Sequence, residues 1–243
     1  MPTLYLRSRP SPRLRSHLGR NSRSMDARTP EHRNYWDSFY AGKRSGAVPA
    51  EPSAFARWTQ RRLSPSQPIV EFGFGNGRDS LWFAREGHPV TGYDFASSAV
   101  SQGQDRAVRE GLPARFFELD LYDSAATAMV AERTAGLGSP ALFGRFLIHS
   151  LEEAGRQNLF DIAATALGAS GGDLYLEFRT GKDQGRKHLF GDDHFRVYLD
   201  PTIVENELVD RGAHILHTEA GHGLSVYKTE DPHVARIVAA WTT

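Results

Sequence analysis

The amino-acid sequence predicts an α/β protein with a doubly wound, mostly parallel sheet of seven strands and an antiparallel hairpin at its C-terminal edge. Three observations lead to this prediction. From residue 67 onwards, short apolar runs alternate with longer amphipathic segments, which is the pattern of strands joined by helices. A glycine-rich stretch follows the first run. Acidic residues stand at or just after the ends of the first three runs.

Composition limits the classes of protein that the chain can represent. Its 243 residues suit one α/β domain with small additions. With 29 basic and 29 acidic residues the formal net charge is zero, so we expect no nucleic-acid partner. The absence of cysteine excludes disulfides and fits a cytoplasmic protein. No apolar run approaches the roughly 18 residues that a membrane span needs, so we expect no membrane association.

Three segments are expected along the chain. Residues 1–28 are rich in arginine, proline and serine, which predicts a flexible basic N-terminal tail. Residues 29–66 predict two helices, which begin near Pro30 and Pro52. Residues 67–243 form the predicted α/β core.

The core elements are expected in a regular order. Each of the first five strands precedes a helix or a long polar loop, which spans residues 180–199. Two closing strands would form a hairpin through Gly221 and Gly223, and Asp231 and Pro232 would begin a short C-terminal helix. The expected strands are 68–72, 89–93, 114–118, 141–148, 173–179, 213–219 and 223–228, and the expected helices are 77–86, 97–110, 123–134, 151–167 and 201–211.

The glycine-rich stretch predicts a nucleotide site. Glycines allow positive φ and a close approach of the backbone to a ligand, and the following helix would point free N–H groups at it. A dinucleotide fingerprint would need a third glycine at the position of Arg78, so that pattern fails. The motif residues are Glu71, Gly73, Gly75, Asn76 and Gly77.

Further polar residues are expected at the same edge of the sheet, because the carboxyl ends of parallel strands meet there. Asp94 at the end of the second strand is expected to accept hydrogen bonds from both ribose hydroxyls of a nucleoside, with Phe95 beside it. Asp120, after the third strand, is expected to accept from an adenine amine, and Leu121 or Leu119 to lie against the adenine ring.

The spacing E-x-G-x-G-x-G, with acids after the second and third strands, resembles the class I S-adenosylmethionine (SAM)-dependent methyltransferases over about residues 30–230. The resemblance implies a Rossmann-like methyltransferase fold, SAM as cofactor and S-adenosylhomocysteine (SAH) as product. It also implies that the N-terminal helices cover SAM and substrate, so Tyr35 and Trp36 are candidate substrate-binding residues. By the same resemblance, Glu71, the three glycines, Asp94 and Asp120 are SAM-binding residues.

The acceptor side is expected around the fourth strand and the long loop. Arg145, in an otherwise apolar strand, would either bind a buried carboxylate or reach the ligand. His149 occupies the usual substrate-facing position of the family, and His149 or His194 is the candidate base. The long loop is rich in hydrogen-bond donors, which favours an anionic acceptor, although internal ion pairs would explain it equally. The further substrate-binding candidates are Arg179, Lys182, Arg196 and Tyr198.

These features together predict a SAM-dependent methyltransferase that acts on an oxygen, or second a nitrogen, of a small and anionic metabolite or of a natural-product or sugar intermediate. No N-P-P-Y motif is present, which disfavours nucleobase methylation. No metal site is expected, because the acids and histidines of the 180–199 loop lack a ligand spacing. Two alternatives stay open: transfer of the aminocarboxypropyl chain of SAM, and SAM binding without catalysis. The protein is expected to be a monomer or homodimer.

Overall fold

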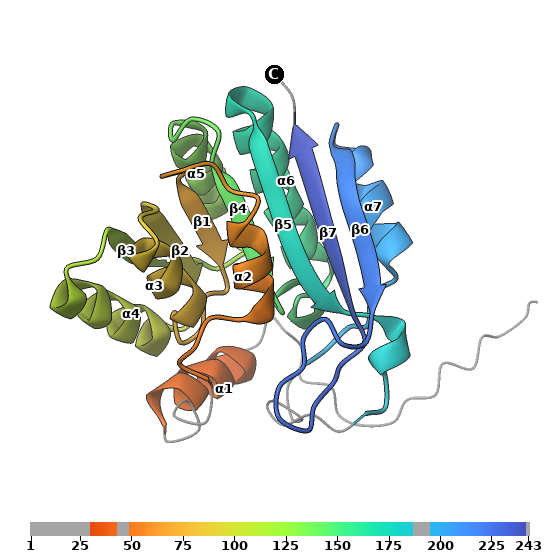
Figure 1. Cartoon of the computed structure of the whole chain (residues 1–243), viewed down its shortest axis with the longest axis horizontal. Coiled ribbons are helices and arrows are strands. Elements are labelled where there is room, and N and C mark those ends of the chain that lie inside the picture. Colours follow the sequence, from red (N-terminus) through yellow and green to blue (C-terminus); the bar gives the residue numbers. More distant parts are fainter. Residues whose placement is uncertain (1–29, 43–48, 187–194, 242–243) are drawn as a thin grey trace, which may run out of the picture.

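The computed structural model describes residues 30–42, 49–186 and 195–241, and in these residues one sheet lies between two layers of helices (Figure 1). The predicted tail and the candidate base His194 fall outside the described residues.

The sheet has seven strands in the order β3-β2-β1-β4-β5-β7-β6. Strands β1 to β5 are parallel, and β7 is antiparallel to both β5 and β6. The order reverses between β1 and β4, which is where ligands bind in open sheets of this kind. The predicted fold class is therefore confirmed. The strands are β1 (Ile69–Phe72), β2 (Val90–Asp94), β3 (Ala114–Glu118), β4 (Ala141–Arg145), β5 (Gly172–Arg179), β6 (His214–Gly221) and β7 (Val234–Trp241).

The helices bury a separate apolar cluster on each face of the sheet. Helices α2, α3 and α4 contribute to one cluster, in which Phe55 of α2 stacks on Phe143 of β4 with ring centroids 5.0 Å apart. Helices α5, α6 and α7 contribute to the other. The helices are α1 (Pro30–Ala41), α2 (Ala54–Gln60), α3 (Arg78–Arg85), α4 (Ser97–Glu110), α5 (Ser124–Ala135), α6 (Glu153–Ser170) and α7 (Pro201–Val209), with short 3₁₀ turns at η2 (Ile148–Ser150) and η3 (Gly181–Asp183).

The C-terminal prediction is wrong in one respect. The strand expected at 223–228 and the helix expected after Pro232 are replaced by a connection at 222–233 and by β7. All eight residues of β7 are buried, because the strand lies inside the sheet between β5 and β6. A run that is apolar on both faces fits a fully buried strand as well as a helix, and here the position inside the sheet decides.

The fourth strand is also shorter than expected. It ends at Arg145, and Phe146 adopts a positive φ of 55° before the η2 turn begins at Ile148. A positive φ is strained for an aromatic residue, and such strain occurs where the surrounding structure enforces it. The backbone N–H of Phe146 donates to the carbonyl of Glu177 at 2.8 Å, which pins this turn to β5.

Helix α1 lies across the carboxyl ends of the strands (Figure 1). It is attached to α4: the Asp37 carboxylate accepts from the Ser98 backbone N–H at 3.1 Å, and the Gln102 side chain donates to the Tyr40 carbonyl at 2.8 Å. This places the aromatic face of α1 over the predicted site. In the part of the chain that the structure describes, no helix is both long and apolar enough to cross a membrane.

Candidate functional site

The glycine loop between β1 and α3 has the backbone conformation that its glycines permit. Gly73, Gly75 and Gly77 all have positive φ, between 57° and 70°. A methyl group on Gly73 would approach Leu147 to 2.8 Å, and one on Gly75 would approach the Tyr40 hydroxyl to 2.5 Å. The loop therefore has no room for side chains at these two positions, and its backbone is exposed to whatever binds beside it.

Asp94 connects this loop to the end of β2. Its carboxylate accepts from the backbone N–H of Gly75 at 2.9 Å and from that of Ala96 at 3.0 Å. Burial raises the pKa of Asp94 to about 6, although these backbone N–H groups favour the ionised form. An ionised carboxylate has about four acceptor sites, so two remain for a ligand.

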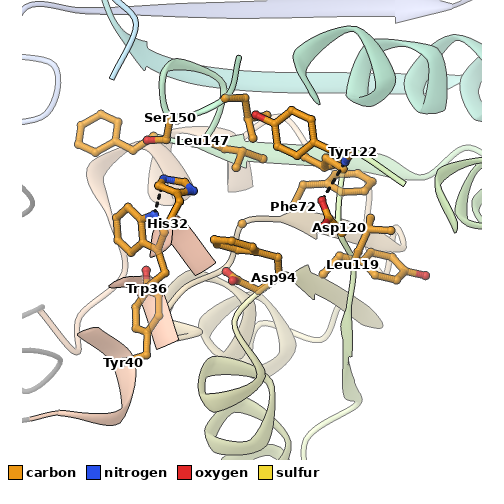
Figure 2. A pocket seen from close by; sticks show the side chains of 16 residues that line it. His32, Trp36, Tyr40, Phe72, Asp94, Leu119, Asp120, Tyr122, Leu147 and Ser150 are labelled. Carbon is orange, nitrogen blue, oxygen red and sulfur yellow. Dashed lines mark hydrogen bonds between the residues drawn. The ribbon is translucent and has the colours of Figure 1, made fainter. Parts of the chain in front are cut away.

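A pocket opens beside Asp94, and we call it the Asp94 pocket (Figure 2). It encloses about 700 Å³ including its open mouth, and most of its walls are apolar or aromatic. A cavity of this size with a few polar groups is typical of a small-molecule site. It is lined by His32, Trp36, Tyr40, Phe72, Gly73, Tyr93, Asp94, Phe95, Leu119, Asp120, Leu121, Tyr122, Phe146, Leu147, Ser150 and Leu151.

Asp120 lines the pocket but already has two partners. One carboxylate oxygen accepts from the Tyr122 backbone N–H at 2.9 Å, and the other forms an ion pair with Arg33 of α1 at 2.9 Å. Arg33 also donates to the carbonyl of Phe95 at 3.2 Å. Arg33 was not predicted, and it attaches α1 to both strand ends that border the pocket.

Helix α1 contributes three rings to the site from one face. His32, Trp36 and Tyr40 are spaced four residues apart, which places them in line along a helix. The Trp36 indole N–H donates to the His32 ring at 3.1 Å, and the His32 ring stacks on Phe95 at 5.7 Å. Only Trp36 of this row was among the sequence candidates. The fourfold spacing is the signal that identifies the other two.

A second cleft continues from the first, and we call it the Arg145 cleft. The two share Trp36, Tyr40, Gly73, Phe146 and Ser150, so they adjoin one another. The cleft encloses about 1060 Å³ including open solvent. It is lined in addition by Phe39, Pro49, Glu71, Phe74, Gly75, Asp79, Arg145, His149, Arg179, Arg196, Ser225, Tyr227, Glu230 and Pro232.

Two acids border the glycine-loop end of the cleft. The Glu71 carboxylate is buried and accepts from the Ser80 hydroxyl, and burial and the nearby charge of Asp79 raise its pKa well above the usual value. Asp79 accepts from the Ser53 backbone N–H at 2.7 Å and from its hydroxyl at 2.8 Å. A cation bound beside Glu71 would restore its ionised form.

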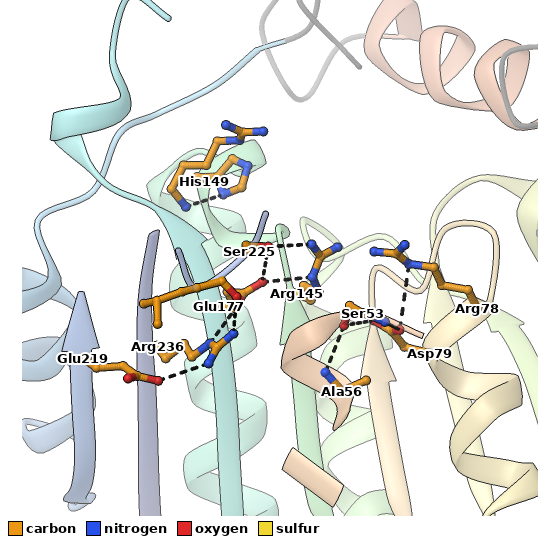
Figure 3. Close-up of polar contacts among 12 residues, drawn as sticks. Ser53, Ala56, Arg78, Asp79, Arg145, His149, Glu177, Glu219, Ser225 and Arg236 are labelled. Atoms are coloured by element: carbon orange, nitrogen blue, oxygen red, sulfur yellow. Dashed lines mark hydrogen bonds and ion pairs between the residues drawn. The ribbon is translucent and has the colours of Figure 1, made fainter. Parts of the chain in front are cut away.

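Arg145 binds a buried carboxylate, the first of the two roles that its sequence position allowed (Figure 3). Its Nε donates to the fully buried Glu177 at 2.9 Å, and one terminal nitrogen donates to the Ser225 hydroxyl at 2.9 Å. The side chain nevertheless lines the cleft and is 17% exposed. Glu177 is also paired with Arg236 at 2.9 Å, so one buried carboxylate fixes two guanidinium groups.

His149 lies in the η2 turn, lines the Arg145 cleft, and is buried. Its Nδ1 accepts from the backbone N–H of Arg179 at 3.2 Å. The neutral ring therefore carries its proton on Nε2 and acts there as a hydrogen-bond donor. The role of His149 as a base stays a prediction, with Nδ1 occupied by this backbone N–H.

The remaining substrate candidates are divided between the cleft and the surface. Arg179 and Arg196 line the cleft, and Arg179 is paired with both Asp183 and Glu230 at 2.5 Å. Lys182 is exposed and lines neither cavity.

Tyr35, Tyr198 and Asn76 also lie outside both linings. Tyr35 packs edge-on against Trp36 at 5.3 Å, on the outer side of the aromatic row. The Asn76 amide donates to the carbonyl of Pro49 at 3.1 Å, so this residue fixes the loop before α2 instead of facing the pocket.

Residues of the 222–233 connection were missed because that segment was expected to be a strand and a helix. It contributes Ser225, Tyr227 and Glu230 to the cleft. Phe146 was also missed, although it lines both cavities and lies between two guanidinium groups, 4.1 Å from that of Arg145 and 5.1 Å from that of Arg179.

Comparison with known proteins gives a match at the first half of the core. Residues 69–133 match a family model described as a methyltransferase domain. A ribosomal RNA small subunit methyltransferase C of Alcanivorax borkumensis is 37% identical over 54 residues. That alignment covers 22% of this chain and 17% of the relative.

Solved structures share the fold over most of the chain. A SAM-dependent methyltransferase from Anabaena variabilis aligns with a TM-score of 0.66 and 15% identity over 90% of this chain and 100% of that one. The glycopeptide N-methyltransferase MtfA complexed with SAM aligns with a TM-score of 0.57 and 17% identity, over 90% and 100%. The [4+2]-cyclase SpnF aligns with a TM-score of 0.56 and 17% identity, over 77% and 81%.

The family match contains the glycine loop, Asp94 and Asp120, and the structural matches extend over the whole sheet. Residues 69–133 thus match a methyltransferase domain, and the chain as a whole has the fold of the SAM-dependent methyltransferases to which it is similar.

Proposed function

We propose that this protein binds SAM in the Asp94 pocket and transfers its methyl group to an oxygen of a small, anionic metabolite in the Arg145 cleft. The observation that carries the proposal is the continuity of the two cavities through Gly73 and Phe146, at the carboxyl ends of β1 and β4. The same chemistry on a nitrogen is the second choice.

The residues present fit SAM on three counts. Asp94 retains acceptor capacity for two ribose hydroxyls after its two backbone bonds. Leu119 and Leu121 supply apolar walls for an adenine ring. Glu71, buried beside the loop, suits the ammonium group of the methionine end. Bound SAM supplies an electrophilic methyl group on a sulfonium, so the protein has mainly to orient the acceptor and exclude water.

The chain offers groups for both tasks on the acceptor side. The aromatic row of α1 and Phe146 would exclude water from the junction between the cavities. Arg145, His149 and Tyr227 supply polar groups for orienting an acceptor. Their number and mixed polarity suit a small molecule, and the zero net charge fits a protein that works without a nucleic-acid partner. We further propose that it works in the cytoplasm, away from membranes, as a monomer or homodimer.

A second candidate keeps SAM but not methyl transfer. The fold is shared with a [4+2]-cyclase, so the same scaffold accommodates other chemistry. Transfer of the aminocarboxypropyl chain belongs to this group. SAM binding without catalysis is a third candidate, because the glycine loop and Asp94 would serve binding whether or not transfer follows.

The test has two steps. Calorimetry with SAH should give saturable binding at one site per chain, and no binding would contradict every SAM-based reading. Incubation of the protein with methyl-labelled SAM and a small-molecule extract of its source cells should then transfer label to extract molecules and release SAH. Release of methylthioadenosine instead would support the aminocarboxypropyl alternative.

A further inference from the structure

Two cations face one another at the edge of the Arg145 cleft: Arg145 from β4, which lines the cleft, and Arg78 from the start of α3, which does not (Figure 3). The Arg78 side chain is 13% exposed, and its closest carboxylate oxygen, on Asp79, is 3.9 Å away. Burial lowers the pKa of Arg78, and the charge of Arg145 lowers it further. Two like charges held together in a partly buried place repel each other unless an anion lies between them.

The guanidinium of Arg145 is held in a fixed orientation and still has N–H groups that can donate to a ligand. Nε and one terminal nitrogen are used by Glu177 and Ser225, which fix the plane of the guanidinium. No described residue accepts a hydrogen bond from the other terminal nitrogen. A planar guanidinium held in this way presents N–H groups with a geometry that matches a carboxylate.

Arg179 and Asp79, which also line the cleft, already have partners. Arg179 is paired with Asp183 and Glu230, and Asp79 accepts from both donors of Ser53. Arg145, by contrast, shares its single carboxylate partner with Arg236 and keeps an unused terminal nitrogen at the cleft. Arg145 is therefore suited to bind an anionic group of a ligand.

We propose that Arg145, with Arg78 behind it, binds a carboxylate group of the methyl acceptor and so selects carboxylate-bearing substrates. This inference rests on the proposed function and names the substrate class. We assign the bound carboxylate to the acceptor and not to SAM, because Arg145 lies beside Phe146 and Ser225. The methionine end of SAM would bind at the glycine loop, where the acids Glu71 and Asp79 lie. The ring of Phe146, 4.1 Å from the guanidinium, adds an apolar wall beside this cation.

The experiment uses para-fluorobenzoate and its uncharged isostere para-fluorobenzamide as probes, followed by fluorine NMR on the SAH-loaded protein. We expect saturable line broadening for the carboxylate and weak or no broadening for the amide. Arg145→Met should weaken carboxylate binding at least about tenfold, and Arg145→Lys should recover part of it, because a lysine retains the charge but not the fork. Arg109→Met, on the exposed face of α4, is the matched control and should bind like the wild type.

Folding and donor binding are checked in the same samples. SAH affinity should stay unchanged in Arg145→Met, in which Glu177 keeps its ion pair with Arg236, and Arg145→Lys, which retains a charge beside Glu177, is the second variant if the first is unstable. Three results would overturn the inference: equal binding of the two probes, no saturable binding of either probe, or carboxylate binding that Arg145→Met leaves intact. If Arg145→Met weakened SAH but not methylthioadenosine, which lacks the amino-acid end, the arginine would serve the carboxylate of the donor and the inference would also fail. Absence of SAH binding in the wild type would instead defeat the proposed function.

Discussion

The Asp94 pocket and the Arg145 cleft adjoin one another but are built differently. Most of the Asp94 pocket comes from the ends of β1, β2 and β3, and Asp94 is hydrogen-bonded to the glycine loop next to it. The Arg145 cleft combines β4, β5 and the 222–233 connection, and its central cation is held by a buried carboxylate on the neighbouring strand. The first is built mainly at the ends of three adjacent strands, whereas the second joins segments that lie far apart in the sequence. In the proposed function the first region binds the donor and the second the acceptor.

Among the variants that test this difference between the two regions, the largest change in SAH affinity is expected at Asp94. Asp94→Ala removes the acceptors for both ribose hydroxyls and leaves the Gly75 N–H without its partner. Because a hydrogen bond to a charged group contributes about 1.5–3 kcal/mol, we expect SAH affinity to fall by at least about 100-fold in calorimetry. Asp161→Ala, on the exposed face of α6 and in neither lining, is the control and should leave SAH affinity unchanged. Unaltered binding by Asp94→Ala would refute the assignment of the pocket.

A substitution at Gly75 tests whether the glycine loop can accept a side chain. Gly75→Ala adds a methyl group 2.5 Å from the Tyr40 hydroxyl at a positive φ of 57°. Gly111→Ala meets no neighbour within 4 Å and has a similar φ of 63°, so it incurs only the backbone strain of about 1–2 kcal/mol. We expect both variants to lose stability in thermal unfolding. Only Gly75→Ala should also lose SAH affinity, by about tenfold for each 1.4 kcal/mol that moving Tyr40 away from the new methyl group costs. Equal SAH affinities would show that Tyr40 does not close on the loop.

The pH dependence of donor binding should distinguish the two regions. Asp94 has a pKa raised to about 6 by burial, and ribose hydroxyls donate to its ionised form. Protonation therefore competes with binding: SAH affinity should be constant above pH 6 and fall by up to about tenfold per unit below it, with uptake of a proton on release of SAH. Calorimetry in buffers of different ionisation heats measures this proton. A flat profile through pH 6 would contradict the role of Asp94.

The smallest of these effects is expected from the 222–233 connection. Ser225→Ala removes one hydrogen bond that orients Arg145 and another to Glu177. A net contribution of about 0.5–1.5 kcal/mol predicts a two- to tenfold loss of para-fluorobenzoate affinity with SAH affinity unchanged. A matched loss of both would mean that the connection supports the whole site and not the acceptor end.

Sequence patterns reveal local features of this molecule better than distant ones. The glycine loop, Asp94 and the parallel strands follow from turns and periodicities within a few residues. By contrast, β7 was expected to be a helix, because Val234–Trp241 is apolar on both faces and only its place between two strands distinguishes the alternatives. The left-handed turn at Phe146 and the ion pair of Arg33 with Asp120, 87 residues away, also depend on neighbours that adjacent sequence does not identify.

The acceptor candidates show the same limit. Arg145 was expected because a cation in an apolar strand requires an explanation, and it lines the cleft. Lys182 was expected from its place in a long loop, but it is exposed away from both cavities, because the η3 turn buries Asp183 instead. Residue type and loop position indicate a functional segment, and the direction of each side chain depends on the packing around it.

The central claim is that the two regions serve different ligands, and SAH calorimetry of Asp94→Ala and Arg145→Met side by side tests it most directly. The account predicts that SAH affinity collapses in Asp94→Ala and stays within about threefold of the wild type in Arg145→Met, a change below 1 kcal/mol. A comparable loss in both variants, or a larger loss in Arg145→Met, would contradict the division of the site into a donor pocket and an acceptor cleft.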